Sequence, residues 1–443
     1  MKDRKDLTGL TDAELVAELG RRRAEQGRTQ NSYAFEVGLE DDMHRQVSVG
    51  MQQYLDVHAE AQTTASKACP KCGKLCRVRR QSVRRKVRSL HGELFLRRHY
   101  HYCGACKAGW YPLDIELGLP DEGEATARLE QVVLDLGLHG PFEEAAERFS
   151  VHHRGEISEN FVRRVIDRVG RRAEARVDLA ESLRAPATEV PSMLIVQVDG
   201  SMLPTRGEDP WREVKVGLVA RGDQILSKNG RGLITEARFV ARLGHFDDFR
   251  KQLTEALALE RAWECERIVF VGDGASWVWT LADEVCHGAI QILDYPHAVQ
   301  HASEAAQAIF GIGTGLDKLF VSTIERMLWE GRVDDIVHEL EACAFLARGH
   351  SRPALVDLAR YYRTNAQRMR YDFYRREALP CGSGAIESAH RHVLQKRMKL
   401  AGQHWDPARA DRFARLRAAL ATCGSARIYP AIHPEARLTG SYG

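Results

Sequence analysis

The sequence predicts an α/β fold, and three observations indicate it. Short apolar runs at 193–200, 267–275 and 289–295 read as buried strands, and each carries an aspartate at its end. The segment 211–221 alternates between apolar and polar residues, as a half-buried strand does. Helical stretches such as 246–264 separate these strands, and this alternation is typical of an α/β sheet.

The bulk composition allows several domains and excludes a membrane protein. At about 150 residues per domain, 443 residues suggest about three domains, and 44% hydrophobic residues suffice for a core. No apolar run reaches the about 18 residues that a membrane span needs, and the first residues contain no apolar stretch of a secretory signal. We expect a cytoplasmic, nucleoid-associated protein without membrane contact.

The cysteines cluster in a way that indicates a metal site. Five of the ten lie between residues 69 and 106, and four of these form two Cys-x-x-Cys pairs. In a reducing compartment such pairs favour metal over disulfides, and four thiolates complete a tetrahedral zinc site. The segment between the pairs alternates around Gly92 like a β-hairpin. We therefore expect a zinc-ribbon-like module at 67–120 that holds one structural Zn²⁺. Cys76 is a spare cysteine, and His99 and His101 are rival ligands. The expected ligands are Cys69, Cys72, Cys103 and Cys106.

The same hairpin is rich in arginine, although the net charge is only +3. A basic surface on a zinc module is typical of a protein that binds a polyanion. The alternative is a solvated basic hairpin. The candidate DNA contacts are Arg79, Arg80, Arg84, Arg85 and Lys86.

Helical regions lie on both sides of this module. Residues 11–25 and 40–60 read as helices of an N-terminal helical region, 1–66. Two short helices, a turn and an arginine-bearing third helix at 158–170 suggest a helix-turn-helix-like DNA-binding region, 121–190. The alternative is an ordinary helical linker. The arginines expected to face DNA are Arg163, Arg164 and Arg168.

Carboxylates at the ends of the predicted strands carry the chemistry. Asp199 and Asp273 each end an apolar strand and precede a glycine, and α/β folds place their sites at that edge of the sheet. Two such carboxylates repel each other unless a cation lies between them, and Mg²⁺ prefers oxygen ligands of this kind. Asp294 also ends a strand and competes with both. Each aspartate alone could equally be a turn residue or a helix cap.

A third carboxylate, Glu387, lies just inside a predicted helix that follows a glycine-rich turn. A carboxylate there gains from the helix dipole. Cations follow in the same helix, as suits a DNA phosphodiester held beside a metal ion. The predicted phosphate contacts are Arg391, Lys396, Arg397 and Lys399. Trp277, Trp279 and Trp405 could stack on bases, but we favour core positions for them.

Five segments together resemble bacterial insertion-sequence transposases of the DDE type, with the ISKra-type elements and their relatives as the nearest group. They are VQVDGSMLPTR (196–206), WREVKVG (211–217), FVGDGASWVW (270–279), ILDYPHA (292–298) and GSGAIESAHRHVLQKRMKLAGQHW (382–405). The resemblance covers about residues 190–422. It implies an RNase H-like core, DNA cleavage and strand transfer, and two Mg²⁺ or Mn²⁺ ions. The triad falls on Asp199, Asp273 and Glu387.

The long interval before Glu387 resembles a helical insertion in the catalytic core. We expect the first part of the RNase H-like core at 191–296, an all-α insertion at 297–380, core helices at 381–423 and a flexible tail at 424–443. The expected function is that of an insertion-sequence transposase. We expect it to act as a homodimer or larger assembly on double-stranded DNA, which includes the element ends and the target. The alternatives are a non-catalytic, zinc-dependent DNA-binding regulator descended from a transposase, and a nuclease of the same fold that cuts without joining.

Overall fold

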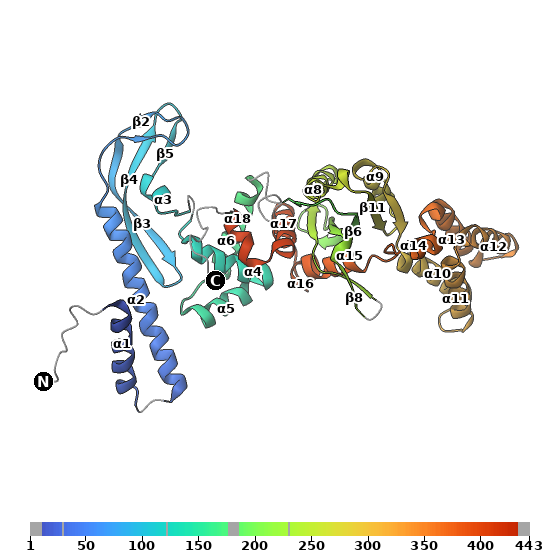
Figure 1. Cartoon of the computed structure of the whole chain (residues 1–443), viewed down its shortest axis with the longest axis horizontal. Helices are drawn as coiled ribbons and strands as arrows, with labels where there is room; N and C mark the ends of the chain where they lie inside the picture. Colours follow the sequence, from blue (N-terminus) through green and yellow to red (C-terminus); the bar gives the residue numbers. More distant parts are fainter. Residues whose placement is uncertain (1–10, 29–30, 121–122, 176–185, 229–230, 433–443) are drawn as a thin grey trace. The chain divides into compact units, whose positions relative to one another are not determined.

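The computed structural model describes residues 11–28, 31–120, 123–175, 186–228 and 231–432. The chain divides into two compact units (Figure 1). One contains the chain up to Val165, and the other contains the described residues from Ile166 on. In the described part of the chain, no helix combines the length and the apolar character that crossing a membrane requires.

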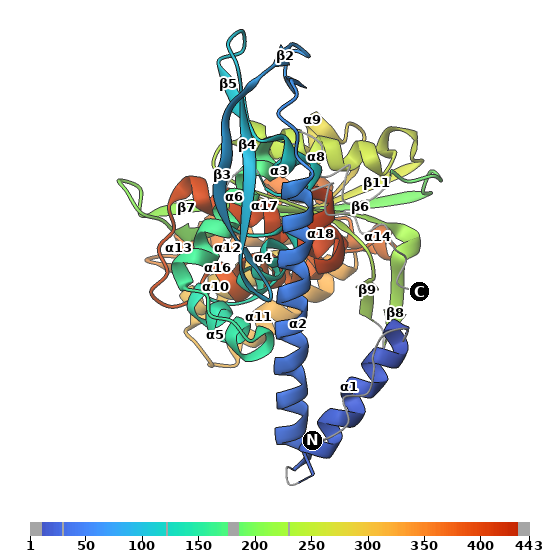
Figure 2. The ribbon, with the colours of Figure 1, turned by 90° about the vertical axis from the view of Figure 1, so that its left-hand side faces the viewer.

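The first unit begins with two helices, α1 (Asp12–Gln26) and α2 (Ser32–Glu60). Thr11 caps α1, and the Glu14 side chain bonds back to the Thr11 backbone, which completes the expected capping box. Helix α2 lies along strand β4 (Gly92–Cys103), as Figures 1 and 2 show. Leu55 of α2 joins a small apolar core with residues of the hairpin, and this burial fixes the helix on the sheet.

The predicted hairpin is confirmed as β3 (Val78–Ser89) paired antiparallel with β4, and β5 (Ala108–Trp110) adds a third strand. A second, two-stranded sheet holds β1 (Lys67–Ala68) and β2 (Leu75–Cys76). Four helices follow in the chain, at the positions expected for the helical region. They are α3 (Pro112–Glu116), α4 (Ala127–His139), α5 (Phe142–His153) and α6 (Glu159–Ala175).

The second unit is built on a five-stranded mixed sheet with the order β10-β7-β6-β11-β12. Strand β6 is central. It pairs antiparallel with β7 and parallel with β11, which in turn pairs parallel with β12. A separate hairpin, β8 (Ile225–Lys228) with β9 (Arg231–Ile234), lies between β7 and β10 in the sequence. The sheet strands are β6 (Met193–Pro204), β7 (Trp211–Arg221), β10 (Arg238–Leu243), β11 (Arg267–Gly272) and β12 (Ile290–Leu293).

Helices cover both faces of this sheet. The side chains of β6 point alternately to the two faces, so each face has apolar surface to bury. Val198 lies on the face that carries α8 (Phe246–Leu259) and α9 (Ser276–Val285), where the ring of Phe249 also packs against β7 at Gly217. Gln197 lies on the opposite face, where it bonds to α15. The elements that follow on this side are α15 (Gly384–Ala389), a π-helical segment (His390–Gln395), α16 (Lys396–Met398), α17 (Pro407–Cys423) and α18 (Ser425–Ile432).

The chain between β12 and α15 is helical, as predicted (Figure 1). Its apolar residues form one continuous core with those of the sheet. That this segment is a separate inserted domain stays a prediction. Its helices are α10 (Tyr295–Phe310), α11 (Leu316–Trp329), α12 (Val333–Leu346), α13 (Ser351–Asn365) and α14 (Tyr371–Arg376).

One expectation about the sheet is wrong in detail. Asp199 does not end its strand, because β6 continues to Pro204. The extension is held by β7, which pairs with β6 as far as Trp211, whereas the parallel neighbour β11 stops pairing at Gln197. Asp199 thus ends only the part of β6 that lies between two strands.

Candidate functional site

Three aspartates stand in one row across the parallel strands. Gln197 of β6 pairs with Val271 of β11, so Asp199 and Asp273 each lie two residues beyond the last pair. Gly272 pairs with Leu293 of β12, which places Asp294 level with Asp273. Because neighbouring strands are about 4.8 Å apart, this register brings Asp199 and Asp273 side by side at one edge of the sheet.

The first two aspartates are partly exposed and have few partners. Asp199 Oδ1 accepts the Gly200 N–H at 2.7 Å, and Asp273 Oδ1 accepts the Ala275 N–H at 3.0 Å. The hydroxyl of Tyr361, from α13, donates to the Asp273 carbonyl oxygen at 3.1 Å. These backbone bonds thus engage one oxygen of each carboxylate.

Asp294 has a different role, because it is fully buried and saturated with hydrogen bonds. Its Oδ2 accepts the His297 N–H at 3.1 Å and caps α10, and it lies 2.5 Å from His297 Nδ1. Its Oδ1 accepts the Ser383 N–H at 2.6 Å. The hydrogen bond from Asp294 is the main cause that raises the pKa of His297, and Asp273 and Asp199 act in the same direction. His297 thus faces the row of aspartates.

Gln197 fixes the start of α15 against the central strand. This residue is 2% exposed, donates to the Gly382 carbonyl at 3.1 Å and accepts the Ile386 N–H at 3.0 Å. Glu387 is the next residue and is exposed. The helix that carries Glu387 is therefore tied to β6 two residues before Asp199.

His390 provides a second link between this helix and Asp199. Its Nε2 lies 3.1 Å from Asp199 Oδ2, and its side chain is buried. Glu387 lies three residues earlier, about one helical turn away, so it belongs to the same face as His390. The helix of Glu387 is thus linked to Asp199, while the place of the Glu387 carboxylate beside the two aspartates stays a prediction.

Asp199, Asp273 and Glu387 do not form a closed group of ligand atoms. Among the described residues, only the cysteine group discussed below has its ligand atoms all within 4.8 Å of one another. Two-metal sites spread their ligands over two ions about 3.5–4 Å apart and complete them with substrate phosphates. That Asp199, Asp273 and Glu387 together hold two such ions stays a prediction.

The predicted cations around Glu387 separate into three groups. Arg391 and Lys396 are exposed. Lys399 Nζ donates to Ser201 Oγ, two residues beyond Asp199, and its pKa is lowered by burial, with Asp199 acting in the opposite direction. Of these three, Lys399 lies near Asp199, and phosphate contacts by all three stay predictions.

Arg397 corrects the prediction. It is 1% exposed, and its guanidinium lies 5.5 Å from the ring centre of Trp405 and 4.9 Å from that of Phe413. Arg397 is thus a core residue and does not face DNA. Trp405 and Trp279 are buried, which agrees with the core positions favoured for the tryptophans.

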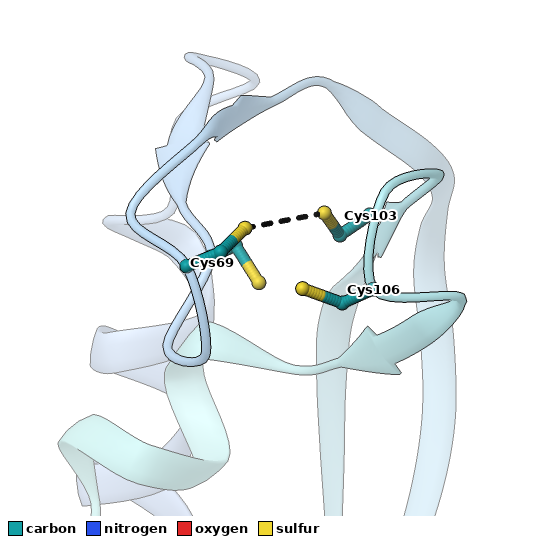
Figure 3. Close-up of side chains that lie close together, drawn as sticks. Cys69, Cys103 and Cys106 are labelled. Carbon is teal, nitrogen blue, oxygen red and sulfur yellow. Dashed lines mark hydrogen bonds between the residues drawn. The ribbon is translucent and has the colours of Figure 1, made fainter.

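The cysteine site is assembled as expected. The Sγ atoms of Cys69, Cys72, Cys103 and Cys106 all lie within 4.8 Å of one another, and the Cys72 and Cys103 sulfurs are 3.7 Å apart. A zinc tetrahedron with Zn–S bonds of about 2.3 Å has edges of about 3.8 Å. Figure 3 shows Cys69 facing Cys103 and Cys106 from a separate loop. The group is consistent with a structural zinc ion.

Local electrostatics move the pKa values of two of these cysteines in opposite directions. The backbone N–H of Cys106 is the main cause that lowers the pKa of Cys103 to about 6. The hydrogen bond with Cys72 is the main cause that raises the pKa of Cys106 to about 12. Deprotonation of Cys106 would add a negative charge beside other thiolates, which is unfavourable. A cation among the four sulfurs would remove this repulsion.

The rival ligands are engaged elsewhere. Cys76 is buried beside the group, and its Sγ contacts the Lys74 carbonyl at 3.3 Å. His101 Nδ1 lies 3.1 Å from the Cys76 carbonyl oxygen, and His99 Nδ1 accepts the Ser82 N–H at 3.2 Å. Zinc-ligand roles for these residues find no support.

The basic hairpin also needs a correction. Arg85 is 8% exposed, pairs with Asp114 at 2.8 Å, and donates to the Pro120 carbonyl at 2.7 Å. It braces the hairpin from inside and is not a DNA contact. Lys86 is partly exposed and pairs with Glu93. Exposed guanidinium groups remain at Arg79, Arg80 and Arg84.

In α6, Arg164 is exposed, whereas Arg163 and Arg168 are half-buried. The following turns of the helix pack on α17, since Asp167 pairs with Arg409 at 2.7 Å and Gly170 lies against the stem of Arg412. That face of α6 is therefore occupied within the protein.

The sequence reasoning missed Gln197 and His390. A signal existed for each. Gln197 is a polar residue in an otherwise apolar strand, two positions before Asp199, and His390 follows Glu387 at helical spacing.

Comparisons with known proteins add little to this geometry. No protein-family model matches the chain, and no curated protein matches it. The structure is similar to the Drosophila P element transposase strand transfer complex, with a TM-score of 0.33 and 9% sequence identity, over 68% of this chain and 92% of that chain. A similarity at this level identifies neither a family nor an activity.

Proposed function

We propose that this protein is a DDE-type transposase that cuts DNA at the ends of an insertion sequence and joins the cut strand to a target. The observation that carries the proposal is the common register of Asp199 and Asp273 on adjacent parallel strands. It is supported by the two links, through Gln197 and His390, that hold the helix of Glu387 at the same strand. In this proposal the five-stranded sheet is the RNase H-like core.

The carboxylate oxygens of Asp199, Asp273 and Glu387 fit two Mg²⁺ or Mn²⁺ ions. When bound, such ions activate the attacking oxygen and stabilise the leaving oxygen of a phosphodiester. The chain's own residues position the substrate: Lys399 sits beside Ser201, and exposed Arg391 and Lys396 neutralise backbone phosphates. Gln197 and Asp294 keep Glu387 in place during the reaction.

The zinc module supplies DNA affinity in this proposal. The Cys₄ group closes the open end of the β3–β4 hairpin, so the exposed Arg79, Arg80 and Arg84 are presented on a rigid strand. These contacts are with phosphates and give position rather than sequence. Arg164 of α6 adds a cation in the helical region.

The test is a strand-transfer assay. The donor plasmid carries the reading frame of this chain with the flanking DNA on both sides, and the reaction contains a target plasmid and Mg²⁺ or Mn²⁺. We expect cut and joined products with the wild-type protein, and none with Asp199→Asn, Asp273→Asn or Glu387→Gln. Asp209→Asn is the matched control, because this carboxylate is exposed and pairs with Arg212 at the start of β7.

The outcomes separate the alternatives. Cut DNA without joined DNA would indicate a nuclease of the same fold. DNA binding without cutting, unchanged in the three variants, would indicate a non-catalytic regulator. Cutting that survives Asp199→Asn would exclude the proposed triad.

A further inference from the structure

His390 is an anomaly in the candidate site. The residue is 4% exposed, yet neither ring nitrogen has a hydrogen-bond partner. A buried polar group left in this state costs about 1–3 kcal/mol. His390 also begins the π-helical segment His390–Gln395, and such local π-geometry is frequent at functional sites. Its orientation therefore needs a cause outside ordinary packing.

The geometry toward Asp199 suggests that cause. His390 Nε2 and Asp199 Oδ2 are 3.1 Å apart, close enough for an ion pair, but the nitrogen does not direct a hydrogen bond at the carboxylate. Two ligand atoms on adjacent corners of an octahedron with bonds of about 2.1 Å lie about 3.0 Å apart. The two atoms are thus spaced as neighbouring ligands of one ion.

We propose that His390 is a metal ligand beside Asp199, and that this nitrogen makes the ion position prefer Mn²⁺ to Mg²⁺. This inference rests on the proposed function, because it concerns one of the two ions of that site. A neutral imidazole suits transition-metal ions, whereas Mg²⁺ takes oxygen ligands almost exclusively. Buried between α15 and β6, His390 cannot swing away to let water replace it.

A second cation near Asp199 does not remove the need for this ligand. Lys399 reaches Ser201 Oγ and also acts on Asp199 electrostatically. It balances part of the carboxylate charge, but it leaves both ring nitrogens of His390 without a partner. An ion bound by His390 Nε2 and Asp199 Oδ2 would give this ring nitrogen a partner, which Lys399 does not.

Pulsed electron paramagnetic resonance of bound Mn²⁺ tests the inference directly. The sample is the full chain, loaded with zinc and then with substoichiometric Mn²⁺, with and without ¹⁵N-labelled histidine. We expect a histidine ¹⁴N coupling in the wild-type protein that changes on ¹⁵N labelling. Absence of this coupling in the wild-type protein would overturn the proposal without any variant.

Variants assign the nitrogen. The coupling should disappear in His390→Ala and persist in His297→Ala and His392→Ala, the nearest histidines of the site and of the same helix. Persistence in His390→Ala, or loss in His297→Ala instead, would reject His390 as the ligand. Zinc content and the unfolding transition verify that each variant is folded.

Calorimetric titration with each metal separates this inference from the proposed function. His390→Ala should weaken Mn²⁺ binding by more than the about 10–100-fold expected for loss of an outer-shell partner, with little change for Mg²⁺. Equal losses for both ions would contradict the preference. If Asp199→Asn removes binding and His390→Ala does not, only the histidine inference fails. If Asp199→Asn leaves Mn²⁺ binding intact, the carboxylate site itself is wrong.

Discussion

Asp294 Oδ1 accepts the backbone N–H of Ser383 at 2.6 Å, a bond between residues 89 positions apart. It joins the end of β12 to the residue before α15, so the chain leaves the sheet at Asp294, forms five helices and returns to the same point. The buried carboxylate also caps α10. One side chain therefore holds both ends of the helical segment at the candidate site.

Replacing Asp294 with alanine should destabilise the second unit by about 2–4 kcal/mol, since it removes a helix cap and leaves the buried Ser383 N–H without an acceptor. The matched control is Asp406→Ala, which removes an exposed cap that accepts the Arg409 N–H at 2.9 Å and should cost about 1 kcal/mol. Urea unfolding followed by tryptophan fluorescence measures both. Equal losses in the two variants would contradict the tie described here.

His297 should make stability depend on pH. Its pKa is raised above the ordinary value of 6.5, chiefly by the hydrogen bond with Asp294. A group with a raised pKa stabilises the fold fully below its unfolded pKa, and this contribution is lost as pH rises through the folded pKa. The Tm advantage of the wild-type protein over His297→Gln should therefore be largest below pH of about 6.5 and shrink above it, without added divalent metal. A pH-independent difference would refute this.

Gln197→Leu tests whether the link to α15 matters for catalysis rather than for binding. The variant loses two buried hydrogen bonds to the start of α15, so Glu387 is no longer fixed to β6. We expect DNA cleavage to fall by about 10²-fold or more while DNA affinity changes little, because misplacement of about 1 Å costs that much in rate. Single-turnover cleavage and a filter-binding assay provide the two readouts. Proportional losses in both would indicate general unfolding instead.

The cysteine group should hold about one zinc ion per chain. Cys103→Ser removes a ligand and should abolish tight zinc binding and loosen the β3–β4 hairpin. Cys76→Ser is the matched control, because this thiol is buried beside the group and is not part of it. Metal analysis after gel filtration gives the zinc content. Retention of zinc by Cys103→Ser and loss by Cys76→Ser would mean that the ligand set is different.

Adjacent arginines of β3 should behave in opposite ways. Arg84→Ala removes an exposed cation, so DNA affinity should fall and the slope of its logarithmic salt dependence should decrease by about 1, with a stability change below about 1 kcal/mol. Arg85→Ala removes one of the two arginine partners of Asp114 and the donor to two backbone carbonyls, so it should destabilise the first unit by at least about 2 kcal/mol. Fluorescence anisotropy at several salt concentrations and thermal unfolding distinguish the two. Loss of DNA affinity in Arg85→Ala and loss of stability in Arg84→Ala would instead support Arg85 as a DNA contact.

The sequence predicted the strands whose side chains are apolar over several residues, because burial between helices leaves that pattern. It placed the end of β6 too early, since residues 200–204 have no strand-like pattern and are held only by pairing with β7. Strand β10 was missed for a similar reason: arginines at both 238 and 242 interrupt its apolar residues. Pairing partners, rather than local composition, fix these segments.

The predictions for Arg85 and Arg397 were wrong for the same reason. Arg85 lies on the same face of β3 as Val83 and Val87, because side chains two residues apart in a strand share a face. Its inward direction could therefore have been inferred from the sequence. Arg397 follows Val393 and Leu394 at helical spacing and shares their buried face. In both cases a basic residue was assigned to the surface by its charge, although its position in the period indicated the core.

The tie between Gln197 and Ile386 lay beyond any pattern of a single sequence. The two residues are 189 positions apart, and neither belongs to a motif that requires the other. Glu387 could accordingly be placed only by resemblance to a family, whereas the pairing of Asp199 with Asp273 had a physical basis in the two neighbouring strands.

Gln197 and Ile386, which are 189 positions apart, are also made at different times during synthesis. A ribosome that has just translated Gln197 needs on the order of 10–40 s to reach Ile386, at about 5–20 residues per second. Asp199 and Asp273 are both translated within that interval, before the helix that carries Glu387 exists. On the proposed function, a chain cut short by a nonsense codon in the helical segment would lack Glu387 and should not cut DNA.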